Sequence, residues 1–282
     1  MLNPYRIGIV GHGFVGQAVQ NAFLDQDKFS ITVYDPAFPS ICEIERLYDS
    51  FYEYKEDCLD VIFVCVPTPQ LDNGAIDSSI VQNTVNDLLE NTNAIIVIKS
   101  TVVPSDVPIH KRVIYNPEFL TEQNAKEDFL NAPQHIVGGE TKAIEKLIEV
   151  YRNSKIKNKI FHQMSVKEAS FIKYAINTFL ATKVTFFNQL YDLVQEHDCN
   201  WDTIVNAVTA DKRIAKGHTK VADKGRKRGF GGACFPKDIN AFLQFSKGDF
   251  SLLKEVIYIN DFYRQEYELT NREKTNNINY SK

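Results

Sequence analysis

The ten residues from Gly229 to Asp238, with the sequence GFGGACFPKD, place one cysteine on a glycine-rich turn. Glycine has no Cβ and accepts positive φ, so such a turn lets backbone and ligand approach closely. Pro236 favours the first position of a helix, which predicts that Cys234 lies at a helix N-terminus, where a thiolate is stabilised. Asp238 follows one helical turn later. The pattern indicates a nucleophilic thiol with a nearby carboxylate. The alternative is a buried cysteine acting as a small hydrophobic residue.

Two further polar pairs share this four-residue spacing, Glu118 with Glu122 and Lys173 with Asn177. On a helix the members of each pair share a face. Such pairs are often solvated surface groups, but Lys173 interrupts the mostly apolar run 171–176 and is therefore expected to be buried. A buried lysine with a nearby asparagine supplies hydrogen-bond donors to a developing oxyanion. With a hydride acceptor, the thiol and these donors suit oxidation through a thiohemiacetal and a thioester.

A glycine fingerprint near the N-terminus predicts the hydride acceptor. The segment GHGFVG at residues 11–16 follows an apolar run and opens a helical pattern at residues 17–24. Its glycines allow a tight turn and the close approach of a pyrophosphate to a helix N-terminus. Asp35 ends the next apolar run, where a carboxylate binds ribose hydroxyls and repels a 2′-phosphate. We therefore expect NAD rather than NADP, bound by Gly11, Gly13, Phe14, Val15, Gly16 and Asp35; the alternative is a turn without a ligand.

Small hydroxyl residues follow two other apolar runs of this half. Thr68 comes after residues 61–66, and Ser100 and Thr101 come after residues 94–98. Ligands bind at the carboxyl ends of the strands in open α/β sheets, so these three residues are expected to line the cofactor cleft. They are also ordinary turn formers.

The spacing of apolar runs predicts the elements that position these groups. Runs at residues 7–10, 31–34, 61–66, 94–99, 113–115 and 135–138 alternate with amphipathic stretches, and a last short run lies at 159–162. This alternation predicts a doubly wound, mostly parallel α/β sheet of the Rossmann type over residues 1–160.

The second half is predicted to be helical. Residues 165–196 contain neither Gly nor Pro and repeat apolar residues every three or four positions, which indicates one long central helix, either a spine, a dimer contact or an ordinary core helix. Further helices are expected at 201–208, 237–245 and 252–267, giving an all-helical substrate and dimerisation domain over residues 161–268. Residues 269–282 are polar, and we expect a disordered or peripheral tail.

Bulk composition excludes several classes of protein. The 282 residues carry a net charge of −4, which gives no reason to expect binding to nucleic acid or to a membrane surface. No apolar stretch is long enough to span a membrane, and no cleaved leader is expected. The five cysteines are scattered and never form a CxxC pair, so they predict neither a disulfide framework nor a zinc site. We expect a cytoplasmic protein without a metal.

Taken together, these motifs resemble the UDP-glucose/GDP-mannose dehydrogenase family. The likeness rests on the fingerprint at 11–16, PTP at 67–69, KSTV at 99–102, NPEFLTE at 116–122, FIKYAINTFLAT at 171–182 and the cysteine turn. The resemblance implies an oxidation of a nucleotide sugar such as UDP-glucose to a uronic acid with two NAD. It also implies roles for individual residues. Cys234 resembles the nucleophile, Lys173 and Asn177 the donors to the reacting oxygen, and Asp238 the carboxylate that activates water.

The resemblance also implies roles for the other segments. Glu122 is similar to the residue that assists thioester hydrolysis and contacts the cofactor, with Thr101 holding a water. Glu118, Phe119 and Leu120 match the segment along the substrate, and Lys237 matches a cofactor contact. Phe230 and Gly231 lie on the substrate side of the cysteine turn. Arg213, in DKRI at 211–214, resembles the arginine that reaches the substrate of a partner subunit, which implies a homodimer.

The chain departs from the family pattern in two ways. Members usually continue into a second Rossmann-like domain that closes over the uridine diphosphate, and here we expect that domain to be missing. Residues 211–228 carry eight Lys or Arg against two Asp, and this cationic loop is expected either to hold a diphosphate by charge or to be a solvated surface loop.

From the sequence we predict that the protein is an NAD-dependent nucleotide-sugar 6-dehydrogenase. One alternative is a single-step hydroxyacid dehydrogenase of the 3-hydroxyisobutyrate and 6-phosphogluconate group, which has no need of Cys234. The other is a non-catalytic NAD-binding relic.

Overall fold

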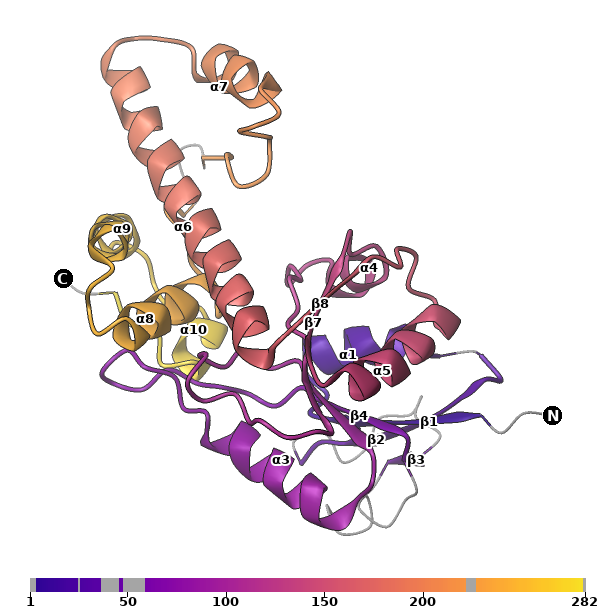
Figure 1. The fold of residues 1–282 in the computed structure, drawn as a ribbon. Coiled ribbons are helices and arrows are strands. Elements are labelled where there is room, and N and C mark those ends of the chain that lie inside the picture. The colour runs from indigo at the N-terminus through magenta and orange to yellow at the C-terminus, as the bar shows by residue number, and fades with distance from the viewer. Residues whose placement is uncertain (1–3, 25, 37–45, 48–58, 222–226, 281–282) are drawn as a thin grey trace. The chain divides into compact units, whose positions relative to one another are not determined.

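The computed structural model describes residues 4–24, 26–36, 46–47, 59–221 and 227–280. The chain divides into two compact units (Figure 1). The first contains Met1–Thr68 and Asp77–Lys173, and the second contains Pro69–Ile76 and Tyr174–Lys282.

The first unit is built on one sheet, which has eight strands among the described residues, in the order β3-β2-β1-β4-β5-β6-β7-β8. Every pairing is parallel except that of β6 with β7. The order reverses at β1, as in the doubly wound folds that bind dinucleotides. The predicted Rossmann sheet is therefore confirmed. The strands are β1 Tyr5–Val10, β2 Phe29–Tyr34, β3 Arg46–Leu47, β4 Val61–Val64, β5 Ile95–Ile98, β6 Val113–Tyr115, β7 His135–Gly139 and β8 Phe161–Met164.

Helices cover both faces of this sheet (Figure 1). Successive residues of a strand point to opposite faces, so apolar residues at every strand position build two cores. Val61 and Phe63 of β4 join the core beneath α1, α4 and α5, whereas Ile62 and Val64 join the core beneath α3. The helices are α1 Phe14–Asn21, α3 Ser79–Asn91, α4 Ala125–Leu130 and α5 Thr141–Asn153.

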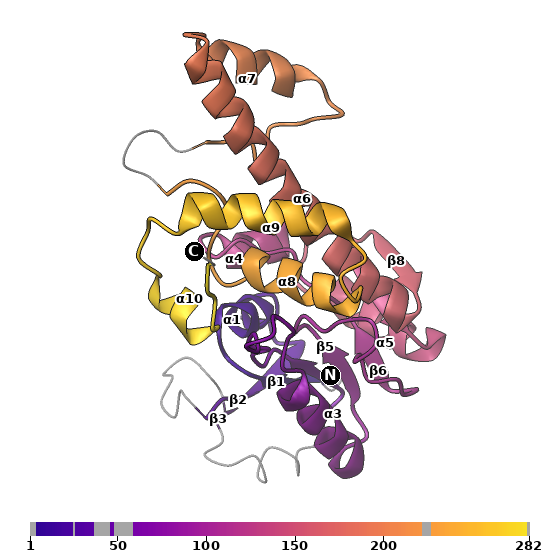
Figure 2. The same ribbon diagram turned by 90° about the vertical axis from the view of Figure 1, so that its left-hand side faces the viewer.

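The long helix α6, Val166–Glu196, confirms the predicted span almost to the residue. Its first turns belong to the first unit, where Val166 and Ala169 join the core beneath α3. The rest belongs to the second unit, whose described elements are otherwise α7 Trp201–Ala210, α8 Phe235–Phe245, α9 Ser251–Arg264 and α10 Asn271–Thr275. In Figure 2, α8 and α9 lie near one another and α7 lies at the far end of α6. Within the described residues, no helix combines the length and apolarity that a membrane crossing requires.

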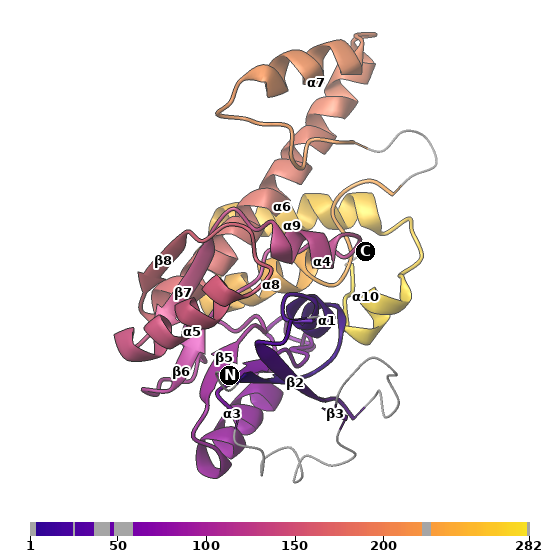
Figure 3. The same ribbon diagram turned by 90° about the vertical axis from the view of Figure 1, so that its right-hand side faces the viewer.

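The expectation of a disordered or peripheral tail at residues 269–282 is wrong for the described part. Thr270 and Glu273 form a capping box that starts α10 (Figure 3). Ile278 and Tyr280, beyond this helix, are buried. The polar composition of this segment gave no sign of its ordered structure. One buried carboxylate and two other buried side chains hold the segment, and these leave no periodic apolar pattern in the sequence.

A short excursion after β4 also belongs to the second unit. In Pro69–Ile76, Leu71 N donates to Ala75 O at 2.7 Å, which closes a turn. Asn277 donates from Nδ2 to the carbonyl of Gln70 at 3.0 Å, and Asn240 donates to the Gln70 side chain at 3.3 Å. The C-terminal segment thus holds this excursion through hydrogen bonds.

Candidate active site

The three fingerprint glycines differ in what surrounds them. Gly11 has φ of +88°, and a Cβ there would lie 2.6 Å from the carbonyl oxygen of Cys65. A Cβ at Gly16 would lie 2.1 Å from the carbonyl oxygen of Gly11, so helix and turn touch at this point. A Cβ at Gly13 would meet no atom within 4 Å, and Gly13 is the N-cap of α1 without a side-chain cap. The helix N-terminus therefore presents open space to an anion, which fits the pyrophosphate of NAD.

Asp35 is tied to the glycine loop. The backbone N–H of His12 donates to its Oδ2 at 2.5 Å, so the end of β2 and the loop after β1 are held together. His12 is itself buried, and its Nε2 pairs with Gln20 Oε1 at 2.8 Å, so this ring nitrogen is engaged within the fold. Phe14 and Val15, the other predicted cofactor contacts, form the first turn of α1.

The hydroxyl residues after β4 and β5 are buried where the strands end. Thr68, Ser100 and Thr101 are all 9% exposed or less. Ser100 Oγ donates to the carbonyl of Val66 at 2.6 Å, so this hydroxyl ties two strand ends together. The role of these three residues in lining the cofactor cleft stays a prediction.

The sequence interpretation missed a buried lysine at this edge of the sheet. Lys99 is 2% exposed and donates to Asn116 Oδ1 at 3.1 Å, an oxygen that also accepts from Tyr151 at 2.7 Å. The pKa of Lys99 is lowered to about 8, mainly by burial; Cys65 and Glu118 oppose this shift, and the charge of Lys173 adds to it. The signal was available, because Lys99 directly follows four apolar strand residues just as Lys173 interrupts an apolar helix.

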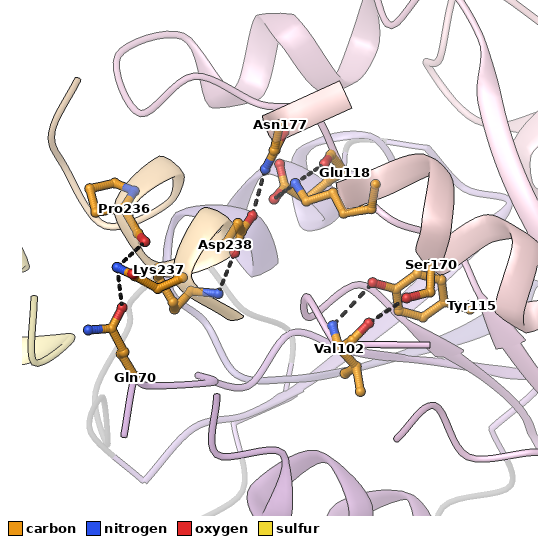
Figure 4. A network of polar contacts seen from close by, with 11 residues as sticks. Gln70, Val102, Tyr115, Glu118, Ser170, Asn177, Pro236, Lys237 and Asp238 are labelled. Carbon is orange, nitrogen blue, oxygen red and sulfur yellow. Dashed lines mark hydrogen bonds and ion pairs between the residues drawn. The ribbon is translucent and has the colours of Figure 1, made fainter. Parts of the chain in front are cut away.

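Lys173 is buried, as predicted, and it is paired. Its Nζ donates to the carbonyl oxygen of Glu118 and lies 3.1 Å from Glu118 Oε1. Glu118 Oε2 accepts from the N–H of Leu120 at 2.7 Å, and the ammonium lies 5.2 Å from the centre of the Phe119 ring. Lys173 therefore holds the segment that was predicted to lie along the substrate. In the same unit, Ser170 donates to the carbonyl of Val102 at 2.7 Å and fixes the start of α6 (Figure 4).

Glu118 and Glu122 do not share a helical face. Both lie in the irregular segment before α4, and Glu122 is exposed whereas Glu118 is 9% exposed. Four-residue spacing implies a common face only where the chain is helical, and Pro117 precedes this pair. The role of Glu122 in hydrolysis stays a prediction.

Asn177 and Asp238 meet in the second unit. Asn177 Nδ2 donates to Asp238 Oδ2 at 2.6 Å, and Lys237 Nζ lies 2.7 Å from Asp238 Oδ1 (Figure 4). Asp238 is 1% exposed and Lys237 is 7% exposed, so both charges are buried together. Sequence analysis assigned Lys237 to the cofactor. The structure pairs it with the neighbouring carboxylate, and a cofactor contact stays a prediction.

Cys234 is the N-cap of α8, which begins at Phe235 with Pro236 in its first turn. The predicted position at a helix N-terminus is confirmed. The N–H of Asp238 donates to the carbonyl of Cys234 at 2.9 Å, so thiol and carboxylate are one helical turn apart. The thiol is half-buried, and Phe230 on the preceding turn is 4% exposed.

The cationic loop lines two open pockets of the second unit. One, of about 480 Å³, is lined by Trp201, Asn206, Lys216, Lys220 and Lys227, among others. The other, of about 430 Å³, is lined by Lys216 and Lys220 together with Gly229, Phe230, Gly231 and Phe235. Two of the lysines thus lie beside the turn that carries the thiol. Lys224 and Arg226 lie outside the described residues.

Arg213, predicted to reach a partner's substrate, points its guanidinium at its own neighbour. Its Nη2 lies 2.6 Å from Asp211 Oδ2, and its side chain is 88% exposed. The exposed pair is worth little stability, so the arginine is available for another carboxylate or phosphate.

Comparison with known proteins identifies the family. A model described as the NAD binding domain of the UDP-glucose/GDP-mannose dehydrogenase family matches residues 46–155, and the model of that family's central domain matches residues 167–262. The chain belongs to the UDP-glucose/GDP-mannose dehydrogenase family.

Relatives in this family share about a third of their aligned residues with the chain. The UDP-glucose 6-dehydrogenase of Rickettsia prowazekii is 33% identical over 77% of this chain and 53% of that protein. A UDP-glucose 6-dehydrogenase of Bacillus subtilis is 30% identical over 76% of this chain and 51% of that protein. The chain spans about half the length of these curated relatives.

A solved structure of the same family has the same fold. The UDP-glucose dehydrogenase of Pyrobaculum islandicum superposes with a TM-score of 0.77 at 26% identity, over 92% of this chain and 68% of that chain. Residues 46–155 lie within the first unit, except for the excursion Pro69–Ile76, so the family's NAD binding domain coincides with the sheet whose glycine loop fits a pyrophosphate. NAD is therefore the cofactor that the first unit is built to bind.

Proposed function

We propose that the chain is an NAD-dependent nucleotide-sugar 6-dehydrogenase that oxidises a primary alcohol twice, to the uronic acid. UDP-glucose is the first substrate to test, because the named relatives are UDP-glucose 6-dehydrogenases. The single observation that carries the proposal is Cys234 as the N-cap of α8, one turn from a buried carboxylate that Asn177 and Lys237 hold.

The chain's residues account for the covalent chemistry. When bound, NAD takes up one hydride in each of the two oxidations. The Cys234 thiolate adds to the carbon of the intermediate aldehyde, a C–S bond forms and the carbonyl oxygen takes a proton, giving a thiohemiacetal. Its oxidation leaves a thioester. Water then adds to the acyl carbon, the C–S bond breaks, the thiolate is released and the sugar carries a carboxylate.

Lys173 and Asn177 are one turn apart on α6, and we propose that both donate to the oxygen that becomes negative in these steps. In the described state each is engaged, Lys173 by Glu118 and Asn177 by Asp238. These acceptors keep the donors ordered, so little reorganisation is needed when a substrate oxygen takes the place of one of them. For hydrolysis we propose Asp238 and Glu122 as the groups that accept protons from water, with Thr101 holding that water.

We propose that the cationic loop binds the anionic part of the substrate. Lys216 and Lys220 line the pocket shared with Gly229, Phe230 and Gly231, and a diphosphate carries the charge that such a pocket favours. The segment Glu118 to Leu120, held by Lys173, would contact the sugar.

We also propose a homodimer through α6. Phe179, Phe186 and Leu193 are spaced by seven residues and are 67%, 58% and 51% exposed. A seven-residue apolar repeat lies along one side of a helix and is typical of helix pairing. Light scattering of purified protein tests this, and Phe186→Lys is expected to convert a dimer into monomers. We further propose a cytoplasmic location.

The test of the function is the appearance of NADH from UDP-glucose and NAD, with mass spectrometry of the sugar product. Two NADH and one uronic acid for each sugar support the proposal. One NADH and a ketone or aldehyde would favour the single-step alternative. If no NADH appeared with UDP-glucose, UDP-N-acetyl-mannosamine or GDP-mannose, the proposed function would be rejected.

A further inference from the structure

The turn that precedes Cys234 is held by side chains from three helical segments. The N–H groups of Gly229, Phe230 and Gly232 donate to Asn188 Oδ1 at 3.2 Å, Asn260 Oδ1 at 2.7 Å and Glu273 Oε1 at 3.1 Å, which lie on α6, α9 and α10. Gly229 and Gly232 have φ of +70° and +80°. Glycine accepts these angles without a steric penalty but is conformationally free, so the three acceptors are what fix the turn in one conformation.

Glu273 is the charged member of this set. It is 0% exposed, and its Oε1 also accepts from Arg264 Nη2 at 2.8 Å and from Tyr280 OH at 2.7 Å. Its Oε2 accepts from the N–H and hydroxyl of Thr270, both at 2.8 Å. Burial raises the pKa of Glu273, but hydrogen bonds from Thr270, Tyr280 and Gly232 outweigh it and lower the pKa to about 2. The group is therefore a carboxylate at neutral pH.

The ion pair of Arg264 and Glu273 also fits closely against the turn. A Cβ at Gly231 would lie 2.6 Å from Arg264 Nη2 and 2.8 Å from Glu273 Oε1. Any side chain at this position would displace the guanidinium or the carboxylate. Turn and ion pair therefore fix each other's position.

A buried ion pair is weak evidence for stability, because desolvation offsets most of the attraction. What this pair adds is placement: one carboxylate oxygen joins the tail, α9 and the backbone two residues before the thiol. Asn188 and residues 227–280, which form this arrangement, all belong to the second unit.

We propose that Glu273 is a positioning residue for Cys234, and that the segment Thr270 to Tyr280 is part of the framework of the cysteine turn rather than an appendage. The role in catalysis rests on the proposed function of Cys234 as nucleophile. The holding of the turn does not rest on it and is measured separately.

The direct test is hydrogen exchange of peptides that cover the turn at residues 228–234, in the full chain. Glu273→Gln keeps the size of the side chain but removes the charge and turns an amide N–H₂ toward groups that donate. We expect exchange of the turn to accelerate at least about fivefold, with peptides of α1 and α3 unchanged. Glu266→Gln, which removes an exposed carboxylate beyond α9, is the matched control and is expected to behave as wild type.

Tyr280→Phe is the milder variant, in case Glu273→Gln does not fold. It removes one hydrogen bond to Oε1 and should accelerate exchange of the same peptides about threefold. Turn exchange equal to wild type in both folded variants would overturn the proposal, as would a uniform acceleration in all helices.

The catalytic consequence has its own readout. In Tyr280→Phe and Glu273→Gln, kcat should fall while KM for NAD stays within about twofold, because the glycine loop of the first unit is untouched. Where the turn loosens and kcat is unchanged, the positioning role is wrong. Where wild type itself oxidises no nucleotide sugar, the proposed function fails and the exchange experiment still decides whether Glu273 holds the turn.

Discussion

Asn177 on α6 donates to Asp238 on α8 at 2.6 Å, and both side chains are buried. The amide predicted to hold a reacting oxygen is thus already aimed at the carboxylate predicted to activate water. Lys237 Nζ lies 2.7 Å from the other oxygen of that carboxylate. Asp238 therefore neutralises the buried charge of its neighbour in the sequence.

Replacing Asp238 should therefore cost stability as well as activity. Asp238→Asn leaves the Lys237 ammonium buried without its counter-charge, and we expect a loss of about 3 kcal/mol in the free energy of unfolding. Urea denaturation measures this loss. Asp249→Asn, at an exposed aspartate just beyond α8, should change it by less than about 0.5 kcal/mol. Equal effects of the two variants would contradict the buried pair.

The pairing of Lys173 with Glu118 leads to a similar expectation in the first unit. Lys173→Met leaves the Glu118 carboxylate buried without a cation, and it should lower the unfolding free energy by about 3 kcal/mol and abolish oxidation. Lys167→Met, at an exposed lysine of the same helix, serves as the control. Retained activity in Lys173→Met would show that this lysine donates to no reacting oxygen.

Alanine substitutions at two glycines of the fingerprint should have different effects, one on NAD binding and the other on stability. Gly13 has φ of −66° and open space at its Cβ, so Gly13→Ala should fold with an unchanged melting temperature but bind NAD at least about tenfold more weakly. Gly16→Ala would place its Cβ 2.1 Å from a backbone oxygen and should lower the melting temperature sharply. Calorimetric titration with NAD and thermal unfolding separate the two effects. Unimpaired NAD binding by Gly13→Ala would place the pyrophosphate elsewhere.

These outcomes also show how far sequence reasoning reached. The fingerprint, the strands and α6 were predictable because they depend on local spacing and on residues that lie close together in sequence. The partner of Lys173 was not, since Glu118 is 55 residues away and only the folded sheet brings it there. Lys99 was overlooked although it carried the same signal as Lys173. Glu273 was hidden because a single buried carboxylate in a polar tail leaves no periodic pattern.

The acid side of the stability curve should depend on Glu273. Its pKa is about 2 in the folded chain, below the ordinary value of about 4.3 expected after unfolding. Its stabilising contribution is therefore fully present above about pH 4.3 and is lost as the pH falls toward 2. We expect wild type to be more stable than Glu273→Gln at pH 7, and the difference in urea midpoint to shrink between pH 5 and pH 3. A difference independent of pH would mean that the carboxylate is not held as described.

The central claim is that Cys234 carries a covalent step of a double oxidation, and the most direct measurement is the yield of NADH and uronic acid from UDP-glucose by wild type and by Cys234→Ala. We expect two NADH and one uronic acid for each sugar with wild type. Cys234→Ala, which loses a half-buried thiol and should fold normally, is expected to form no acid. Uronic acid formed by Cys234→Ala at the wild-type rate would contradict it.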